Sequence, residues 1–234
     1  MKKKTKKRRG VEKTSLIAWL SWSVIGLALL PTLLILITAT LKLITQIPLF
    51  SMQIGMLIMG MIVYFIFHWL VYKPTSLYVL AHELTHAIFA IFSGSRVKKI
   101  KVTAKGGYVE MSQSNLIIDL APYFFPIFAI VWTALFLTGD RLWNWEDYYH
   151  VFFFGLGVLT AFHYACSWDV LKIEQPDMAM TGKIFGIIFV LLANLLIVNV
   201  IIVILFAGDV NLENIWINTY EAYYFWRKIL FGQV

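Results

Sequence analysis

Residues 77–92 read LYVLAHELTHAIFAIF, a mainly apolar run that carries His82, Glu83 and His86. In an α-helix, residues i and i+4 share a face, so the imidazoles of His82 and His86 can converge on one metal ion. Glu83 lies close enough to reach a water on that metal without being a ligand. This spacing is typical of zinc hydrolases and predicts a metal centre with Glu83 as catalytic base. The alternative, two packed histidines on one face, is less favoured because ionisable groups are costly within apolar spans.

The composition of the whole chain is that of a membrane protein. Hydrophobic residues make up 60% of the 234 residues and charged residues 14%, with a mean hydropathy of +0.75. Several runs approach the roughly 20 apolar residues that cross a bilayer. We therefore expect an all-α polytopic membrane protein. It should have about six transmembrane helices and a small membrane-associated β-hairpin after the metal-binding helix.

The basic residues are concentrated at the N-terminus, where the first nine positions hold seven of the twenty. Before a membrane span, such an arm acts in topology and in attraction to anionic lipid rather than in nucleic-acid binding. We expect a multi-pass protein of the cell membrane with a cytosolic N-terminus. Four segments are predicted: a basic arm (1–14), two transmembrane helices (15–74), a core that contains the metal-binding helix (75–206) and an interfacial tail (207–234).

Smaller features add detail to the two N-terminal spans. Pro31 predicts a kink or tilt in the first span. Gly55 and Gly60 predict close helix packing in the second, and His68 near its end is interpreted as interfacial. Cys166 is the single cysteine, which excludes an internal disulfide framework and a four-cysteine metal site.

The segment after the metal-binding helix alternates polar and apolar residues, which predicts a β-hairpin over residues 96–111. An ordinary basic loop is the alternative. The next span, predicted at 116–138, contains Pro122 and Pro126. Backbone groups left unpaired by these prolines are tolerated only against protein or a wet cavity, so this segment should face the site.

The predicted topology contains one conflict. Thr75 or Ser76 is expected to cap the metal-binding helix, which is counted as a third crossing. That count places the basic hairpin on the side opposite the N-terminal arm, against the positive-inside rule. Either the hairpin is embedded, or the number of spans is wrong by one.

A catalytic zinc usually has three protein ligands and an open position for water. Glu110, Asp169 and Asp177 are the candidates for the third ligand. Asp177 is favoured because Pro176 fixes the preceding backbone and an apolar span follows. One Zn²⁺ with two neutral imidazoles and the carboxylates of Asp177 and Glu83 has no net charge, the least costly state in a low-dielectric site.

These features together resemble the site-2 protease family of intramembrane zinc metalloproteases. The resemblance covers about residues 75–199 and rests on the motif at 82–86, the hairpin sequence KGGY at 105–108 and the aspartate before the last span. Two positions depart from the family pattern. Asp177 is followed by Met178 rather than glycine, and Thr85 stands where glycine is common before the second histidine.

The resemblance implies a zinc-dependent endopeptidase that hydrolyses peptide bonds in or near transmembrane segments of membrane-protein substrates. It also implies that an extended substrate pairs with a strand edge of the hairpin. Gly106, Gly107, Tyr108 and Asn194 are the candidate substrate-binding residues. No nucleic-acid partner is expected.

Three other functions stay open at this point. A divalent-metal transporter would need further ligands on a second helix, where His163 is the mid-span candidate. A catalytically silent relative could act as a membrane binding or regulatory protein. A different class of membrane zinc protease would use Glu110 as the third ligand.

Overall fold

The computed structural model describes residues 16–103, 106–172, 176–178 and 181–232; the predicted basic arm lies outside them. The described chain is mostly helical, with one two-stranded antiparallel sheet. Its elements, in order, are α1 (Leu16–Ala28), α2 (Leu30–Thr45), α3 (Met52–Leu70), α4 (Thr75–Phe92), β1 (Val97–Thr103), β2 (Gly106–Met111), α5 (Leu116–Leu120), η1 (Ala121–Tyr123), α6 (Ile127–Trp143), η2 (Glu146–Tyr148), α7 (Tyr149–Leu171), η3 (Pro176–Met178), α8 (Lys183–Leu205) and α9 (Leu212–Phe231).

Among the described residues, five helical segments are long and apolar enough to cross a membrane. They are Leu16–Thr45, Met52–Leu70, Thr75–Phe92, Glu146–Leu171 and Lys183–Leu205. A sixth is obtained if Leu116–Tyr123 and Ile127–Trp143, which are bent by 76°, count as one broken span. Large apolar side chains remain exposed along these helices, as on surfaces that face lipid. A mostly helical chain with a small hairpin is thus confirmed.

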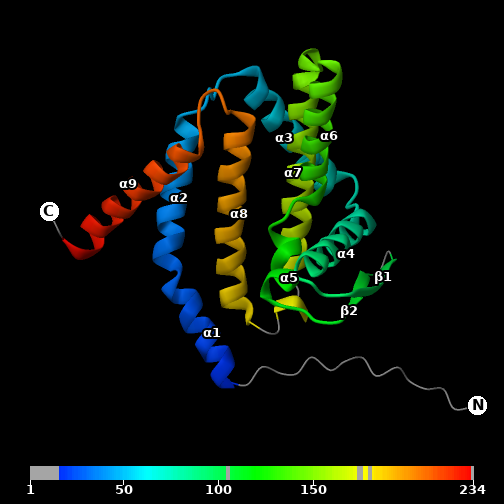
Figure 1. Ribbon diagram of the computed structural model, residues 1–234, viewed down its shortest axis with the longest axis vertical. Helices are drawn as coiled ribbons and strands as arrows, with labels where there is room; N and C mark the ends of the chain where they lie inside the picture. The colour runs from blue at the N-terminus through cyan, green and yellow to red at the C-terminus, as the bar shows by residue number, and fades with distance from the viewer. Residues whose placement is uncertain (1–15, 104–105, 173–175, 179–180, 233–234) are drawn as a thin grey trace, which may run out of the picture.

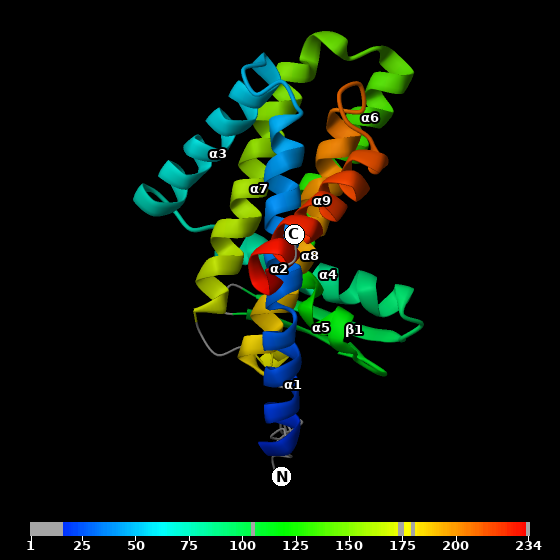
Figure 2. The ribbon, with the colours of Figure 1, turned by 90° about the vertical axis from the view of Figure 1, so that its left-hand side faces the viewer.

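The helices are not all aligned (Figures 1 and 2). In both views α7 and α8 run along the long axis of the molecule, whereas α4 lies across it in the half that also holds the hairpin. This half of the molecule also holds the N-terminal end of α1, the C-terminal end of α7 and the N-terminal end of α8. The sequence predicted α4 as a crossing helix, and its length and apolarity are those of a candidate span.

Helices α3 and α7 pack through paired glycines. A Cβ atom at Gly60 would lie 2.1 Å from the carbonyl oxygen of Phe154, and one at Gly157 would lie 2.1 Å from that of Leu57. Side chains at these positions would therefore force the two backbones apart. The predicted close packing is confirmed at Gly60 and wrong at Gly55, where an added Cβ meets nothing within 4 Å.

The helix ends differ in detail from the sequence-based expectations. The first span breaks between α1 and α2, and Pro31 lies in the first turn of α2, where a missing N–H does least harm. The predicted cap of α4 by Thr75 or Ser76 is wrong: Pro74 takes the N-cap position and no side chain caps the helix.

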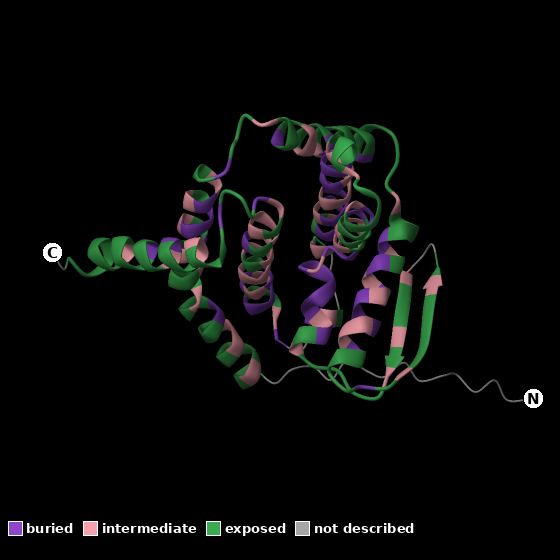
Figure 3. Ribbon diagram, turned by 45° about the horizontal axis from the view of Figure 1, so that its top comes forward, coloured by how far each residue is buried: buried purple, intermediate pink, exposed green. Residues whose placement is uncertain are grey.

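The C-terminal helix α9 lies obliquely along α2 (Figure 1). Polar contacts fix it there: Lys42 pairs with Glu221 at 2.7 Å, and the indole of Trp226 donates to Thr38 at 2.9 Å. Figure 3 shows that most of α9 is exposed, while buried residues gather on α7, on η1 and on one face of α4. The position of this tail at a membrane interface stays a prediction.

Candidate metal centre

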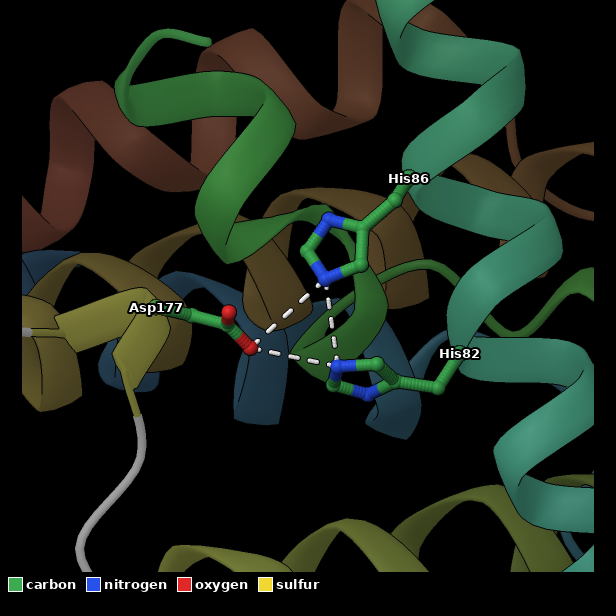
Figure 4. Close-up of side chains that lie close together, drawn as sticks. All are labelled: His82, His86 and Asp177. Atoms are coloured by element: carbon green, nitrogen blue, oxygen red, sulfur yellow. Dashed lines mark hydrogen bonds and ion pairs between the residues drawn. The ribbon is translucent and has the colours of Figure 1, made fainter. Parts of the chain in front are cut away.

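Three side chains from two distant parts of the chain meet beside α4 (Figure 4). His82 and His86 project from successive turns of α4, and Asp177 reaches them from η3. The Nε2 atom of His82 lies 3.1 Å from Nε2 of His86 and 3.1 Å from Oδ2 of Asp177, and His86 Nε2 lies 3.6 Å from the same oxygen. Within the described residues, this is the group whose ligand atoms could hold a metal ion.

The three spacings suit a small four-coordinate ion. An ion with tetrahedral bonds of about 2.0–2.1 Å holds neighbouring ligand atoms about 3.3 Å apart. The observed distances of 3.1, 3.1 and 3.6 Å scatter around that value. Two imidazole nitrogens and one carboxylate oxygen also form the donor set of many catalytic zinc sites, with a fourth position left for water.

A proline on the neighbouring segment orients the ring of His86. Pro122 has no N–H, so the carbonyl of Ile118 four residues earlier has no helical donor. The Nδ1–H of His86 donates to this carbonyl at 2.7 Å. Because a carbonyl only accepts, Nδ1 must carry the proton, and Nε2 is left with its lone pair toward the site. The expectation that the Pro122 segment faces the site is confirmed.

Packing orients the other histidine. The ring of His82 lies between those of Tyr78 and Tyr123, with centroids 5.7 and 5.4 Å away. Its Nδ1 is buried and has no hydrogen-bond partner within the described part of the chain. His82 is thus held by aromatic contacts, whereas His86 is held by a hydrogen bond.

Tyr123 also fixes the carboxylate. Its buried hydroxyl donates to Oδ2 of Asp177 at 2.8 Å, the same oxygen that faces both histidines. Burial acts to raise the pKa of Asp177, but the neighbouring side chains of His82 and His86 outweigh it and hold the pKa of this carboxyl well below its usual range. Asp177 is therefore a carboxylate at neutral pH and offers a negative charge to a cation.

Glu83 lies beside this group and against the hairpin. Its side chain is 7% exposed. A Cβ atom placed on Gly107 would lie 2.6 Å from Cγ of Glu83, 2.8 Å from its Oε1 and 2.7 Å from the carbonyl oxygen of Lys101. Only glycine at position 107 therefore lets the backbone of β2 lie this close to the carboxylate.

The other candidate ligands lie elsewhere. Asp169, on α7, is paired with Lys73 at 2.5 Å and Lys172 at 3.1 Å. Glu110 is an exposed residue of β2, opposite Lys99 in the hairpin register. His163 is buried on α7 and does not belong to the group of three ligands.

The candidate substrate-binding residues are divided between two places. Gly106, Gly107 and Tyr108 belong to β2, and Tyr108 is 44% exposed. Asn194 lies on α8, where its amide donates to the carbonyls of Tyr123 and Val190 at 3.2 and 2.9 Å.

Sequence reasoning missed Tyr123 and the carbonyl of Ile118. The paired prolines indicated that this segment faces the site, but no local signal indicates which of its atoms point inward.

Comparisons with known proteins give no match: no family model matches the chain, and neither does any curated protein or solved structure. Within the residues that it describes, the structure by itself gives a half-buried His–His–Asp group that could hold a metal ion, with a glutamate next to it.

Proposed function

We propose that the chain is an intramembrane zinc endopeptidase, similar in mechanism to the site-2 protease family. One observation carries the proposal: His82, His86 and Asp177 converge at tetrahedral spacings, with the buried carboxylate of Glu83 beside them. A divalent ion would balance the two carboxylates, which are otherwise costly to bury together. The mixed nitrogen and oxygen donors favour zinc over calcium or magnesium, which prefer oxygen ligands alone.

The chain's own residues have separate roles in the proposed reaction. Bound zinc would supply a water activated near neutral pH and would polarise the peptide carbonyl. Glu83 accepts the proton of that water on its carboxylate and passes it to the leaving amine. Tyr123 and the Ile118 carbonyl hold two of the ligands in place, which keeps the site preorganised.

The substrate in this proposal is a membrane protein, cut in or near a transmembrane segment. The hairpin has two strands, and each has one edge without a partner strand in the described structure. An extended peptide can pair with such an edge through its backbone. Contact between Gly107 and Glu83 supports β2 as this edge, with Gly106, Gly107 and Tyr108 as substrate-binding residues.

The same proposal includes a topology in which α4 is embedded in the membrane without crossing it. Its orientation across the bundle supports this assignment (Figure 2). The hairpin, the start of α8 and the start of α1 then share one side, which the positive-inside rule identifies as cytosolic. The conflict in the predicted topology disappears, because α4 no longer carries the basic hairpin to the opposite side.

The decisive experiment compares the wild type with Glu83→Gln, using Glu110→Gln as a matched control on an exposed carboxylate. Cells that carry each form are compared for cleaved membrane proteins, and zinc is measured in the purified proteins. We expect Glu83→Gln to keep zinc while cleavage falls by about 10²- to 10⁴-fold, the usual contribution of a general base. Glu110→Gln should behave as wild type. Undiminished cleavage by Glu83→Gln would sink the proposed mechanism.

Three results would favour the other functions. Metal uptake by vesicles that contain the purified protein would indicate a transporter. Zinc binding without a cleaved protein in any comparison would indicate a catalytically silent relative. If Glu110→Ala rather than Asp177→Ala loses zinc, the third ligand lies on the hairpin.

A further inference from the structure

A cavity of about 730 Å³ lies among α3, α7 and α8, beside the candidate metal centre. Its walls are mostly apolar, with Tyr164 and Leu191 among them. Tyr123 also lines it, and the hydroxyl of this residue donates to Asp177 at 2.8 Å. A molecule in this cavity would therefore be separated from the metal ligands by a single side chain. Its size falls within the range of about 300–1,000 Å³ that is common for ligand sites.

Asn194 lines this cavity and has an unused hydrogen-bond acceptor. Its amide nitrogen is already used by two backbone carbonyls. Its Oδ1 atom is buried and has no partner within the described residues. A peptide in the cavity would offer backbone N–H groups to this oxygen, whereas the acyl chain of a phospholipid has no donor. The unpaired oxygen therefore favours a peptide as occupant.

One end of the cavity is basic. Lys172, Lys183 and the single carboxylate of Asp169 line it there, next to Trp168. Lys172 pairs with Asp169 at 3.1 Å, while Lys183 has no carboxylate partner in the described part of the chain. A net positive rim attracts an acidic group next to the apolar stretch of an occupant.

We propose that this cavity binds the apolar segment of the substrate next to the bond that is cut, with an acidic residue of that segment near Lys172 and Lys183. The identity of the occupant as a substrate rests on the proposed function. The existence of a peptide-binding cavity does not, because the cavity, Asn194 and the basic rim are independent of the metal. Tyr123 then separates bound peptide from the metal ligands.

Site-specific photo-crosslinking of the full chain in lipid nanodiscs tests this directly. A photoreactive amino acid replaces Leu191 on the cavity wall or, as a control, Val200 on the same helix and outside the cavity. The two side chains have similar exposure, 46% and 45%. The probe is a biotinylated peptide of about 20 leucine and alanine residues, enough to span a bilayer, with two aspartates at one end. We expect crosslinks to the peptide from position 191 and not from position 200.

Cavity-blocking variants supply the second measurement. Leu191→Trp should abolish peptide binding by filling the cavity, whereas Val200→Trp should leave it unchanged. Asn194→Leu should weaken binding about tenfold, the effect of one lost hydrogen bond. A peptide with two lysines in place of the aspartates should bind more weakly. Leu191→Trp leaves the hydrogen bonds of Asn194 in place, so it remains informative if Asn194→Leu does not fold.

Three outcomes would overturn the proposal: equal crosslinking from both positions, crosslinks to phospholipid alone, or peptide binding that Leu191→Trp does not alter. All measurements use the Glu83→Gln background and need no cleavage. Peptide binding in the cavity with no cleavage by the wild type would contradict the proposed enzyme but leave the binding site intact. Cleavage without binding in the cavity would support the proposed enzyme and contradict the binding site.

Discussion

The carboxylates of Asp177 and Asp169 each face a buried histidine, but the charged groups around them have opposite signs. Asp177 accepts one hydrogen bond from Tyr123 and lies against His82 and His86, and the carboxylate of Glu83 is close enough to interact with it electrostatically. Asp169 pairs with two lysines as well as with His68, which lies 3.2 Å away.

The difference decides which cluster can hold a metal. With neutral histidines, Asp177 and Glu83 carry a formal charge of −2, which a divalent cation would cancel. Asp169 with Lys73 and Lys172 carries +1, which repels a cation. A histidine next to an aspartate therefore does not by itself indicate a metal site. The sign of the charge around the pair indicates whether a metal ion can bind there.

The largest effect is expected when each of these two aspartates is removed in turn and zinc binding is measured. Asp177→Ala removes a ligand and should lower zinc affinity more than about 100-fold, beyond what loss of an outer partner causes. Asp169→Ala should leave zinc affinity unchanged. Zinc content of the purified variants measures both. If Asp169→Ala loses zinc and Asp177→Ala keeps it, the assignment is reversed.

Crowding of Glu83 should reduce the rate of cleavage by nearly as large a factor. Gly107→Ala adds a methyl group that must displace the Glu83 side chain, and a misplacement of about 1 Å at a catalytic group costs roughly 100-fold. Zinc content should stay at the wild-type level. Gly55→Ala, where space is open, is the matched control. Normal cleavage by Gly107→Ala would show that Glu83 need not lie where the structure places it.

A smaller effect should follow from loss of the Tyr123 hydroxyl. Tyr123→Phe keeps the ring against His82 but removes the hydrogen bond to Asp177, and outer partners of this kind are worth about 10- to 100-fold in metal affinity. Competition with a chelator measures the change. Tyr149→Phe removes a comparable hydrogen bond to Asp140 far from the site and should not alter affinity. Equal affinities for wild type and Tyr123→Phe would contradict this role.

The smallest effect belongs to the second cluster and concerns stability. Asp169→Ala leaves the Nε2 atom of His68 without its carboxylate partner, and His68 is 2% exposed. An unpaired buried polar group costs about 1–3 kcal/mol. The midpoint of denaturant unfolding in detergent should therefore fall, whereas Asp209→Ala, on an exposed loop, should not change it. An unchanged midpoint would mean that water replaces the carboxylate.

The sequence predicted the helices and strands that depend on a local pattern of residues. The metal-binding helix and the hairpin at 96–111 lie close to the observed boundaries. His68 shows where local pattern fails. Its place near the end of a span, beside Trp69 and Tyr72, predicts an interfacial histidine, but Asp169, 101 residues later, meets it from α7.

The orientation of α4 could not be predicted for a related reason. Its length and apolarity are those of a crossing helix. Its direction is set by the segments packed against it, namely the hairpin, α5 and η1. Hydropathy measures how apolar a helix is, but it carries no information on the angle at which other elements hold it.

Pro122 has a consequence for how mutations in this chain should be interpreted. It lies outside the group of metal ligands, yet any other residue there would bring an N–H that competes with His86 for the carbonyl of Ile118. The ring of His86 could then rotate or change tautomer, and its lone pair would no longer be committed to the metal. Substitutions at position 122 should therefore resemble ligand mutations in their effect, because the useful property of this residue is the donor that it lacks.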